Sequence, residues 1–293
     1  ATIYQGARVL DVLFAGEKAS GVRAKLADGT TRDFAAEVVV DASGQSALLS
    51  RKLKISHTEP TLKKASIYTH FSGAQRDSGR DEGATLILNT CDKDSWFWYI
   101  PLHNDTVSVG VTGDIDYLLQ NRAGDAQEIF VEELEKCAPM QERLQNAQQL
   151  FPVKTTKDFS YRAQQVAGAG WVLVGDAFGF LDPVYSSGVY LALKSGEMAA
   201  DVIDAAFKKG DFSAAQLGQF GPDFVRGLEA VRRMVYAFYS KEFSFSKFLM
   251  RYPHCKQGII DVLSGKLFSE HVETIFEPMA EMCPMPEEIA LAS

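Results

Sequence analysis

The sequence predicts a mixed α/β (α+β) fold in which an antiparallel β-sheet region is inserted into a larger α/β domain that ends in helices. Three observations lead to this prediction. Residues 38–40 are three consecutive valines, which is typical of a parallel strand covered on both faces. Residues 60–113 contain short segments rich in β-branched and aromatic residues. From residue 188 onward, apolar residues recur at helical spacing.

Length and composition limit the classes of function. The chain has 293 residues, of which 46% are hydrophobic and 23% are charged. At about 150 residues per domain, this length predicts two domains or one large domain with an added lobe. The formal net charge of −8 argues against a uniformly basic nucleic-acid-binding surface. The first residues show no positively charged, apolar leader pattern, so we expect no signal peptide, and no apolar run approaches the roughly 20 residues of a membrane-spanning helix. We therefore predict neither a nucleic-acid partner nor a transmembrane segment.

The cysteines and histidines predict no metal site. The four cysteines are far apart in the sequence and form no CxxC pair. The five histidines show no HExxH or other ligand spacing. Because scattered thiols are typical of a reducing compartment, we expect a cytoplasmic protein.

The first part of the chain predicts an antiparallel meander followed by a buried strand. Asp28 and Gly29 signal a hairpin turn between the last two of three expected strands, at residues 8–14, 21–26 and 31–34. The buried strand follows at 37–41. A helix is expected over residues 46–53, with Ser46 as its N-cap.

The middle of the chain predicts a second β region. Its expected strands are residues 65–71, 84–88, 95–101 and 106–112. Residues 75–83 are polar and predict a loop. Helical periodicity appears between 114 and 150, and a further strand is expected over 155–162.

The last part predicts a buried strand at 170–176, a helix over 188–207 and two to four helices within 212–284. Since no linker divides the chain, the order of elements predicts one domain inserted into another. We assign four parts: residues 1–59 and 155–210 to the larger α/β domain, 60–154 to a β-sheet substrate domain with a helix, and 211–293 to a C-terminal helical region.

Residues 212–252 combine many aromatic side chains with interleaved arginines and lysines. Such a segment could lie on a membrane or dock a partner. The interpretation we favour is a set of helices that pack over the β region and keep a solvated face.

The segment after residue 170 carries the strongest chemical pattern. An apolar strand delivers Gly175 and Asp176 at its carboxyl end, where open α/β sheets bind ligands. Asp182 and the proline after it form a tight loop, and a long helix begins near Gly188. The free N–H groups and partial positive charge at such a helix end favour an anion or a reduced flavin ring. An ordinary strand–turn–helix junction is the alternative, which the joint order of these features disfavours.

This segment reads GDAFGFLDPVYSSGVYLAL and resembles the second half of the FAD fingerprint of flavin monooxygenase-like enzymes. Its DPVYSSGV part is most similar to the flavin-dependent halogenases. The resemblance implies a Rossmann-type, glutathione-reductase-like FAD-binding domain. It also implies that Gly175 and Asp176 contact FAD, and that the isoalloxazine ring is lined by Pro183, Ser186, Ser187 and Gly188. In the family the halide lies at the last Ser-Gly pair, which is Ser187 and Gly188 here.

Two further motifs carry the same resemblance. Residues 38–46, VVVDASGQS, are similar to the strand-plus-DASGxxS element of the superfamily, which implies that Asp41 and Gly44 lie at the cofactor. Residues 96–101, WFWYIP, match the WxWxIP motif of the halogenases. Alternation along a strand places Trp96 and Trp98 on one face, where two rings can line a cavity or pack in a core. The resemblance makes Trp96 and Trp98, with Ser186, the candidate catalytic residues.

The dinucleotide-binding motif GxGxxG, with which the family begins, does not occur in this sequence. The resemblance implies that this motif and the catalytic lysine of halogenases would both precede Ala1. We therefore expect a FAD-binding domain that is incomplete at its N-terminal side.

The resemblance predicts a flavin-dependent halogenase. It would act on an electron-rich aromatic or phenolic small molecule with O₂, halide and FAD reduced by a separate flavin reductase. Some members of the family act on substrates tethered to a carrier protein. Two alternatives stay open: a FAD-dependent reductase or hydroxylase similar to geranylgeranyl reductases or aromatic hydroxylases, and a non-catalytic remnant or binding module.

Overall fold

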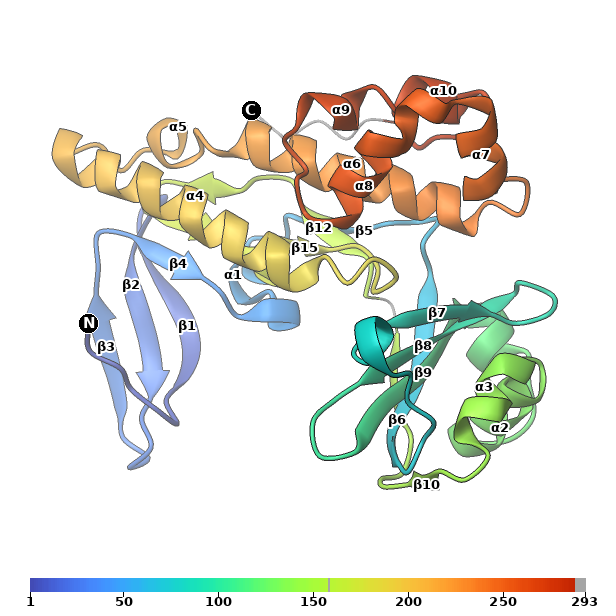
Figure 1. Ribbon diagram of the computed structural model, residues 1–293. Coiled ribbons are helices and arrows are strands. Elements are labelled where there is room, and N and C mark those ends of the chain that lie inside the picture. Colours follow the sequence, from blue (N-terminus) through green and yellow to red (C-terminus); the bar gives the residue numbers. More distant parts are fainter. Residues whose placement is uncertain (158, 288–293) are drawn as a thin grey trace. The chain divides into compact units, whose positions relative to one another are not determined.

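The computed structural model describes residues 1–157 and 159–287 and divides into two compact units (Figure 1). Unit 1 is built from residues 1–57 and 161–293, and unit 2 from residues 58–160. The chain therefore leaves unit 1, forms unit 2 and returns to unit 1.

Unit 1 begins with an antiparallel meander. Its sheet has the order β1-β2-β3, made of β1 (Arg8–Ala15), β2 (Lys18–Lys25) and β3 (Thr31–Ala35). The three strands expected from the sequence are all present. Leu26 and Thr30 close the β2–β3 turn through a backbone hydrogen bond of 2.8 Å, as the Asp-Gly signal predicted.

The second sheet of unit 1 joins segments far apart in the sequence. β4 (Val39–Asp41) pairs in parallel with β14 (Trp171–Leu173), which pairs antiparallel with β13 (Ala167–Gly168). Asp41 lies opposite Leu173, so the loops that follow β4 and β14 leave the same edge of the sheet.

The expected burial of the valine strand on both faces is wrong. β4 is the last strand of the order β13-β14-β4, and Val40 is 46% exposed, whereas Val39 is buried. Among the described residues, no strand pairs with the second edge of β4.

Three short strands form a third sheet in the order β15-β12-β5: β5 (Ser56–Thr58), β12 (Tyr161–Ala163) and β15 (Gly179–Phe180). The single strand expected over 155–162 is therefore wrong. β11 (Lys154–Lys157) instead pairs with β6 of unit 2, so two strands in different sheets share this stretch. Position 158, within the expected strand, lies outside the described residues.

Unit 2 is an antiparallel sheet with helices on one face. Its order is β10-β6-β9-β8-β7, with β11 also on β6. The strands are β6 (Lys64–Ser72), β7 (Leu86–Asn89), β8 (Ser95–Pro101), β9 (Thr106–Asp114) and β10 (Gln148–Gln149). A π-helical turn (Asp116–Gln120) leads to α2 (Ala126–Glu135) and α3 (Ala138–Leu144), which lie together beside the sheet in Figure 1.

The core of unit 2 fills the space between this sheet and its helices. Phe97 and Tyr99 point from β8 into the same buried cluster as Phe130 of α2 and Met140 of α3. Side chains alternate along a strand, so Trp96 and Trp98 lie on the opposite face of β8.

The remaining helices of unit 1 cover its sheets. α1 (Leu48–Lys52) follows β4, and α4 (Gly188–Lys209) is the long helix expected after the Ser-Ser-Gly segment. Short 3₁₀ turns occur in unit 1 at Gly44–Ser46, Gly175–Ala177 and Pro253–Cys255, and in unit 2 at Gly79–Asp81.

More helices follow α4 than the two to four that the sequence predicts. They are α5 (Ala214–Leu217), α6 (Gly221–Tyr239), α7 (Phe245–Arg251), α8 (Lys256–Leu263), α9 (Glu270–Glu273) and α10 (Phe276–Ala280). Several are shorter than two turns, and serine caps such as Ser213 and Ser244 begin them where periodicity gives no signal. None of the helices within the described residues is long and apolar enough to cross a membrane.

Candidate functional site

The end of β4 is organised by Asp41. This residue is 6% exposed, and both of its carboxylate oxygens accept hydrogen bonds from the backbone: Oδ1 from Ser43 N at 2.9 Å and Oδ2 from Leu49 N at 2.7 Å. The carboxylate therefore fixes the turn after β4 and satisfies an N–H group at the start of α1.

The predicted cap of this helix is wrong. Ser46 lies inside the 3₁₀ turn, and Ala47, in the left-handed region at φ 44°, is the N-cap of α1. The helix has no side-chain cap from Ala47, and Asp41 and Ser43 supply the acceptors instead, because the turn brings them back over the first helical residues. A cap eight residues upstream has no local sequence signal.

Gly175 allows α4 to approach the end of β14 closely. Its φ of +55° lies in the left-handed region, and a Cβ at this position would lie 3.0 Å from the Cβ of Ala192 in α4. Its N–H donates to Ser195 Oγ at 2.8 Å, and that hydroxyl donates to the Ala192 carbonyl at 3.0 Å. The strand end and the helix are therefore held together at a residue that has to be glycine.

Asp176 presents an unpaired carboxylate. Among the described residues, no side chain or backbone group hydrogen-bonds to its carboxylate, although its backbone carbonyl accepts from Tyr161 OH at 2.7 Å. Burial raises the pKa of the Asp176 carboxyl. Burial, with a further contribution from the charge of Asp176, raises the pKa of Tyr161 to about 12. A half-buried carboxylate with no protein partner is suited to accept hydrogen bonds from the hydroxyls of a ligand.

These residues surround one cavity of about 380 Å³. Its lining combines residues from the ends of β4 and β14 with the first turns of α4: Ala42, Gly44, Val174, Gly175, Asp176, Phe180, Gly188, Val189 and Ala192. Gly44 has a φ of +62°, and no atom lies within 4 Å of the position of its absent Cβ. The structure thus brings together Gly44, Gly175, Asp176 and Gly188. Asp41 lines a neighbouring cavity of about 480 Å³.

The segment from Asp182 to Ser187 forms a tight turn before α4. Asp182 is 3% exposed, and its Oδ1 accepts from Val184 N at 2.9 Å. Ser186 N donates to the Pro183 carbonyl at 3.0 Å, and Ser186 has a φ of +51°. Pro183, Ser186 and Ser187 belong to this turn and do not line the 380 Å³ cavity.

The N-terminus of α4 carries no side-chain cap. Ser187 is its N-cap residue and makes no side-chain capping bond, while its carbonyl accepts from Leu191 N at 2.9 Å. The first N–H groups of a 22-residue helix are therefore available at Gly188 and Val189, which line the cavity. This end of the helix dipole favours an anion or developing negative charge.

Residues of α6 support this turn, and no sequence motif indicates them. The hydroxyl of Tyr239, the last residue of α6, donates to Asp182 Oδ2 at 2.9 Å. Tyr185 OH donates to the Met234 carbonyl at 3.0 Å, and the Tyr185 ring contacts Phe238 with centroids 6.2 Å apart. Burial, together with the charge of Asp182, raises the pKa of Tyr185. The aromatic residues at 236–239 belong to the segment 212–252, which the sequence predicts as helices packed over the β region with a solvated face.

Trp96 and Trp98 lie side by side on β8 of unit 2, with ring centroids 6.1 Å apart. Trp96 is 2% exposed. Trp98 Nε1 donates to Ser108 Oγ at 3.2 Å, and the Trp98 ring lies 6.0 Å from that of Tyr68. The two tryptophans belong to a different unit from the glycine and aspartate residues around the cavity.

Gly110 makes room for Trp98, because a Cβ there would lie 2.2 Å from Trp98 Cζ2. We expect Gly110→Ala to displace the indole, to break its bond to Ser108 and to cost about 1–3 kcal/mol of stability. The change is measured by near-ultraviolet circular dichroism and by thermal unfolding. Gly83→Ala is the control, since no atom lies within 4 Å of its absent Cβ. A Gly110→Ala spectrum identical to the wild type would contradict this placement of Trp98.

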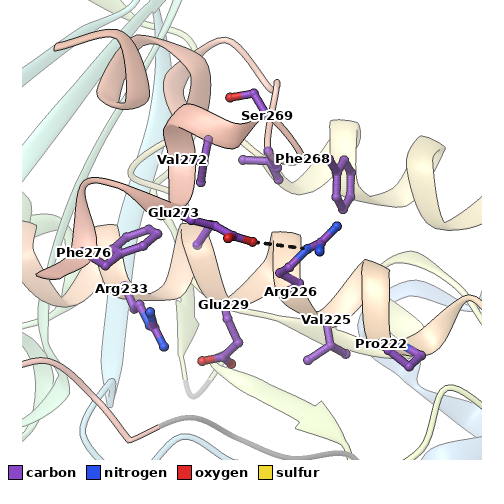
Figure 2. Close-up of a pocket in the computed structure, with 12 residues that line it drawn as sticks. Pro222, Val225, Arg226, Glu229, Arg233, Phe268, Ser269, Val272, Glu273 and Phe276 are labelled. Carbon is purple, nitrogen blue, oxygen red and sulfur yellow. Dashed lines mark ion pairs between the residues drawn. The ribbon is translucent and has the colours of Figure 1, made fainter. Parts of the chain in front are cut away.

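A larger cavity of about 760 Å³ lies among the C-terminal helices (Figure 2). Residues of α6, such as Val225 and Arg226, face Val272, Glu273 and Phe276 across it. Arg226 and Glu273 form an ion pair at 3.8 Å. None of the site residues predicted from the sequence lines this cavity. In the described part of the chain, no group of three or more His, Cys, Asp or Glu side chains could hold a metal ion.

Comparison with known proteins identifies relatives over most of the chain. The family model described as tryptophan halogenase matches residues 12–257. A 1H-pyrrole-2-carbonyl-(peptidyl-carrier protein) chlorinase of Pseudomonas fluorescens is 29% identical over 287 residues, which cover 96% of this chain and 63% of the relative. The corresponding brominase of Pseudoalteromonas luteoviolacea is 31% identical over 269 residues, which cover 90% of this chain and 65% of the brominase.

Solved structures agree with these matches. The flavin-dependent brominase Bmp2 superposes with a TM-score of 0.84 at 27% identity, covering 94% of this chain and 69% of that one. A flavoprotein/dehydrogenase from Cytophaga hutchinsonii superposes with a TM-score of 0.78 at 23% identity, covering 93% and 66%, which shows a shared fold alone. The mixed α/β fold with an antiparallel sheet and C-terminal helices is thereby confirmed. The chain spans slightly less than two thirds of the length of the two curated relatives.

Proposed function

Because this chain belongs to the tryptophan halogenase family, we propose that the protein it represents is a FAD-dependent oxidoreductase that halogenates an electron-rich aromatic substrate. The observation that carries this proposal is the cavity where the ends of β4 and β14 meet the uncapped N-terminus of α4, with the unpaired Asp176 carboxylate in its wall. Ligands of open α/β sheets bind at such strand ends.

The residues around this cavity fit FAD. Gly44, Gly175 and Gly188 leave its walls without side chains, and Asp176 offers an acceptor for the hydroxyls of the ribityl chain. Asp41 acts through the turn that it holds, since its two oxygens already accept backbone N–H groups. Reduced FAD, supplied by a separate flavin reductase, would provide the two electrons that activate O₂, and the activated oxygen would in turn accept two electrons from the halide, with its other oxygen atom released as water.

The turn before α4 is the proposed halide site. Pro183 and Ser186 shape the turn, and the backbone N–H groups at Ser187 and Gly188 lie at the positive end of the helix dipole. Backbone donors held in this way bind an anion without a charged side chain. Ser186 belongs to the catalytic set because it sets the backbone direction of this turn through its left-handed conformation.

Trp96 and Trp98 are proposed to line the path of the substrate ring. The partly exposed indole of Trp98 offers an apolar surface on which an aromatic substrate can stack, and the buried ring of Trp96, with its centroid 6.1 Å away, holds that indole in place. In this proposal residues 60–154 form the substrate domain, residues 1–59 and 155–210 form the FAD-binding domain, and residues 211–293 form the helical region that supports it.

The curated relatives suggest the class of substrate. Two of them are named for the chlorination and bromination of pyrrole-2-carbonyl groups carried by a peptidyl carrier protein. We extend this to an electron-rich phenolic or pyrrolic ring, presented free or on a carrier protein, in a cytoplasmic reaction that also requires a flavin reductase. No part of this chemistry involves nucleic acid.

The full-length protein, FAD, a flavin reductase and bromide or chloride are incubated with phenols, free pyrroles and pyrrolyl groups on a carrier protein. Mass spectrometry of the products is expected to show the mass and isotope pattern of an added halogen. Oxidised or hydroxylated products without halogen would contradict halogenation and favour the hydroxylase or reductase alternative. A protein that binds no flavin and yields no product would favour a non-catalytic binding module.

A further inference from the structure

The last residue of helix α6 bonds to the proposed halide turn through a buried carboxylate. Tyr239 ends this helix, and its hydroxyl donates to Oδ2 of Asp182 at 2.9 Å. The other oxygen of the same carboxylate accepts from Val184 N at 2.9 Å. A buried carboxylate therefore connects the end of α6 to the backbone of the turn, and no residue of α6 lines the cavity beside that turn.

The turn has a conformation that needs such support. Ser186 holds a φ of +51°, which a residue with a side chain seldom adopts. A conformation of this kind persists only when surrounding contacts determine it. Here those contacts come from within the turn, through Ser186 N and Pro183 O, and from α6, through Tyr239 and through the bond of Tyr185 to the Met234 carbonyl.

We propose that Tyr239 is a positioning residue for the halide turn. It acts through Asp182, whose orientation sets the direction of the Val184 N–H and, beyond it, of the backbone at Ser187 and Gly188. The inference deepens the proposed function, since it rests on the assignment of halide to this turn. Tyr239 itself is not one of the residues that line the 380 Å³ cavity.

The test compares two Tyr→Phe variants of the full-length protein. Tyr239→Phe removes the hydroxyl bonded to Asp182. Tyr252→Phe is the matched control, because it removes a tyrosine hydroxyl that also donates to a carboxylate, that of Glu281, at an exposed position. Hydrogen exchange is measured on the peptide covering residues 182–190 in both variants. We expect exchange at Val184 and Ser186 to quicken about tenfold in Tyr239→Phe alone, as loss of a hydrogen bond to a charged group predicts.

Steady-state kinetics with bromide give the second readout. In Tyr239→Phe the KM for halide is expected to rise about tenfold while kcat at saturating halide stays within about twofold, because the donors remain present but are held less firmly. In an Asp182→Asn background, the same Tyr239→Phe change is expected to raise the KM for halide much less, since the two residues act as one pair.

Unchanged exchange over residues 182–190 and an unchanged KM for halide would overturn the positioning role. Equal effects of Tyr239→Phe with and without Asp182→Asn would overturn the path through Asp182. The exchange measurement needs no turnover, so it decides the positioning role even if the wild-type protein forms no halogenated product. That last result would count against the proposed function alone.

Discussion

Replacing Glu133 with alanine is expected to destabilise unit 2 by about 1.5–3 kcal/mol, because it removes a buried carboxylate that accepts several hydrogen bonds and leaves two partly buried cations, Arg122 and Lys136, without their counter-charge. Glu133 is fully buried in α2. Its carboxylate accepts from Ser95 Oγ at 2.5 Å, from Tyr117 OH at 2.9 Å and from Lys136 Nζ at 2.8 Å, and it also pairs with Arg122. Ser95 is the first residue of β8, so this network holds the start of the strand that carries the tryptophan pair.

The neighbouring residue Glu132 supplies the control. It also pairs with Arg122, but its side chain is 50% exposed. Glu132→Gln is therefore expected to change the free energy of unfolding by less than about 1 kcal/mol. Urea unfolding of both variants makes the comparison. A loss for Glu133→Ala no larger than that for Glu132→Gln would contradict the role of the buried network.

The loss of stability in Glu133→Ala is expected to depend on pH, and the direction of that dependence follows from the pKa of Glu133. Burial alone would raise the pKa of Glu133, but hydrogen bonds from Lys136, Ser95, Arg122 and Tyr117 outweigh it, so the pKa lies below its usual value. A carboxyl with a depressed pKa contributes stability above its unfolded-state pKa of 4.5 and loses that contribution as the pH falls through its folded-state pKa. The difference between wild type and Glu133→Ala is therefore expected to shrink below about pH 4.5.

Replacing Asp176 with asparagine is expected to weaken FAD binding by about 10- to 100-fold. This range in the dissociation constant corresponds to the loss of charge-assisted hydrogen bonds worth about 1.5–3 kcal/mol. Flavin fluorescence measures the dissociation constant. Asp201→Asn, an exposed carboxylate on α4, is the control and is expected to bind FAD as the wild type does.

The same substitution is expected to stabilise the flavin-free protein. Burial raises the pKa of Asp176, so the folded state binds the proton more tightly than the unfolded state does. Stability then falls as the pH rises from the usual pKa of 3.8 through the raised one, and the ionised carboxylate costs stability at neutral pH. Asparagine avoids this cost. If Asp176→Asn lowers both the melting temperature and the affinity for FAD, the Asp176 carboxylate has a structural role, and its assignment as a FAD-binding group is contradicted.

The parts of the site that depend on local sequence were predictable. The sequence shows a strand that ends in Gly175 and Asp176 and a helix that begins at Gly188. Once these two elements pack together, the N-terminus of the helix lies at the end of the strand. Gly44 reaches the same cavity because β4 pairs in parallel with β14. The tryptophan pair followed from alternation along a single strand.

The parts that depend on distant contacts were not predictable. The hydroxyl of Tyr239 bonds to Asp182, which lies 57 residues earlier in the sequence, and no sequence motif links the two positions. Asp41 replaces Ser46 as the acceptor at α1 because a turn folds back over the helix. Val40 is exposed because burial of a strand depends on its neighbours in the sheet, which three valines do not specify.

The central claim is that the cavity between the ends of β4 and β14 and the start of α4 holds the flavin. A crystal structure of the full-length protein soaked with FAD tests it most directly. The account predicts density for the cofactor in contact with the Asp176 carboxylate and with the backbone at Gly188. Density for FAD bound elsewhere, with Asp176 still facing solvent, would contradict it.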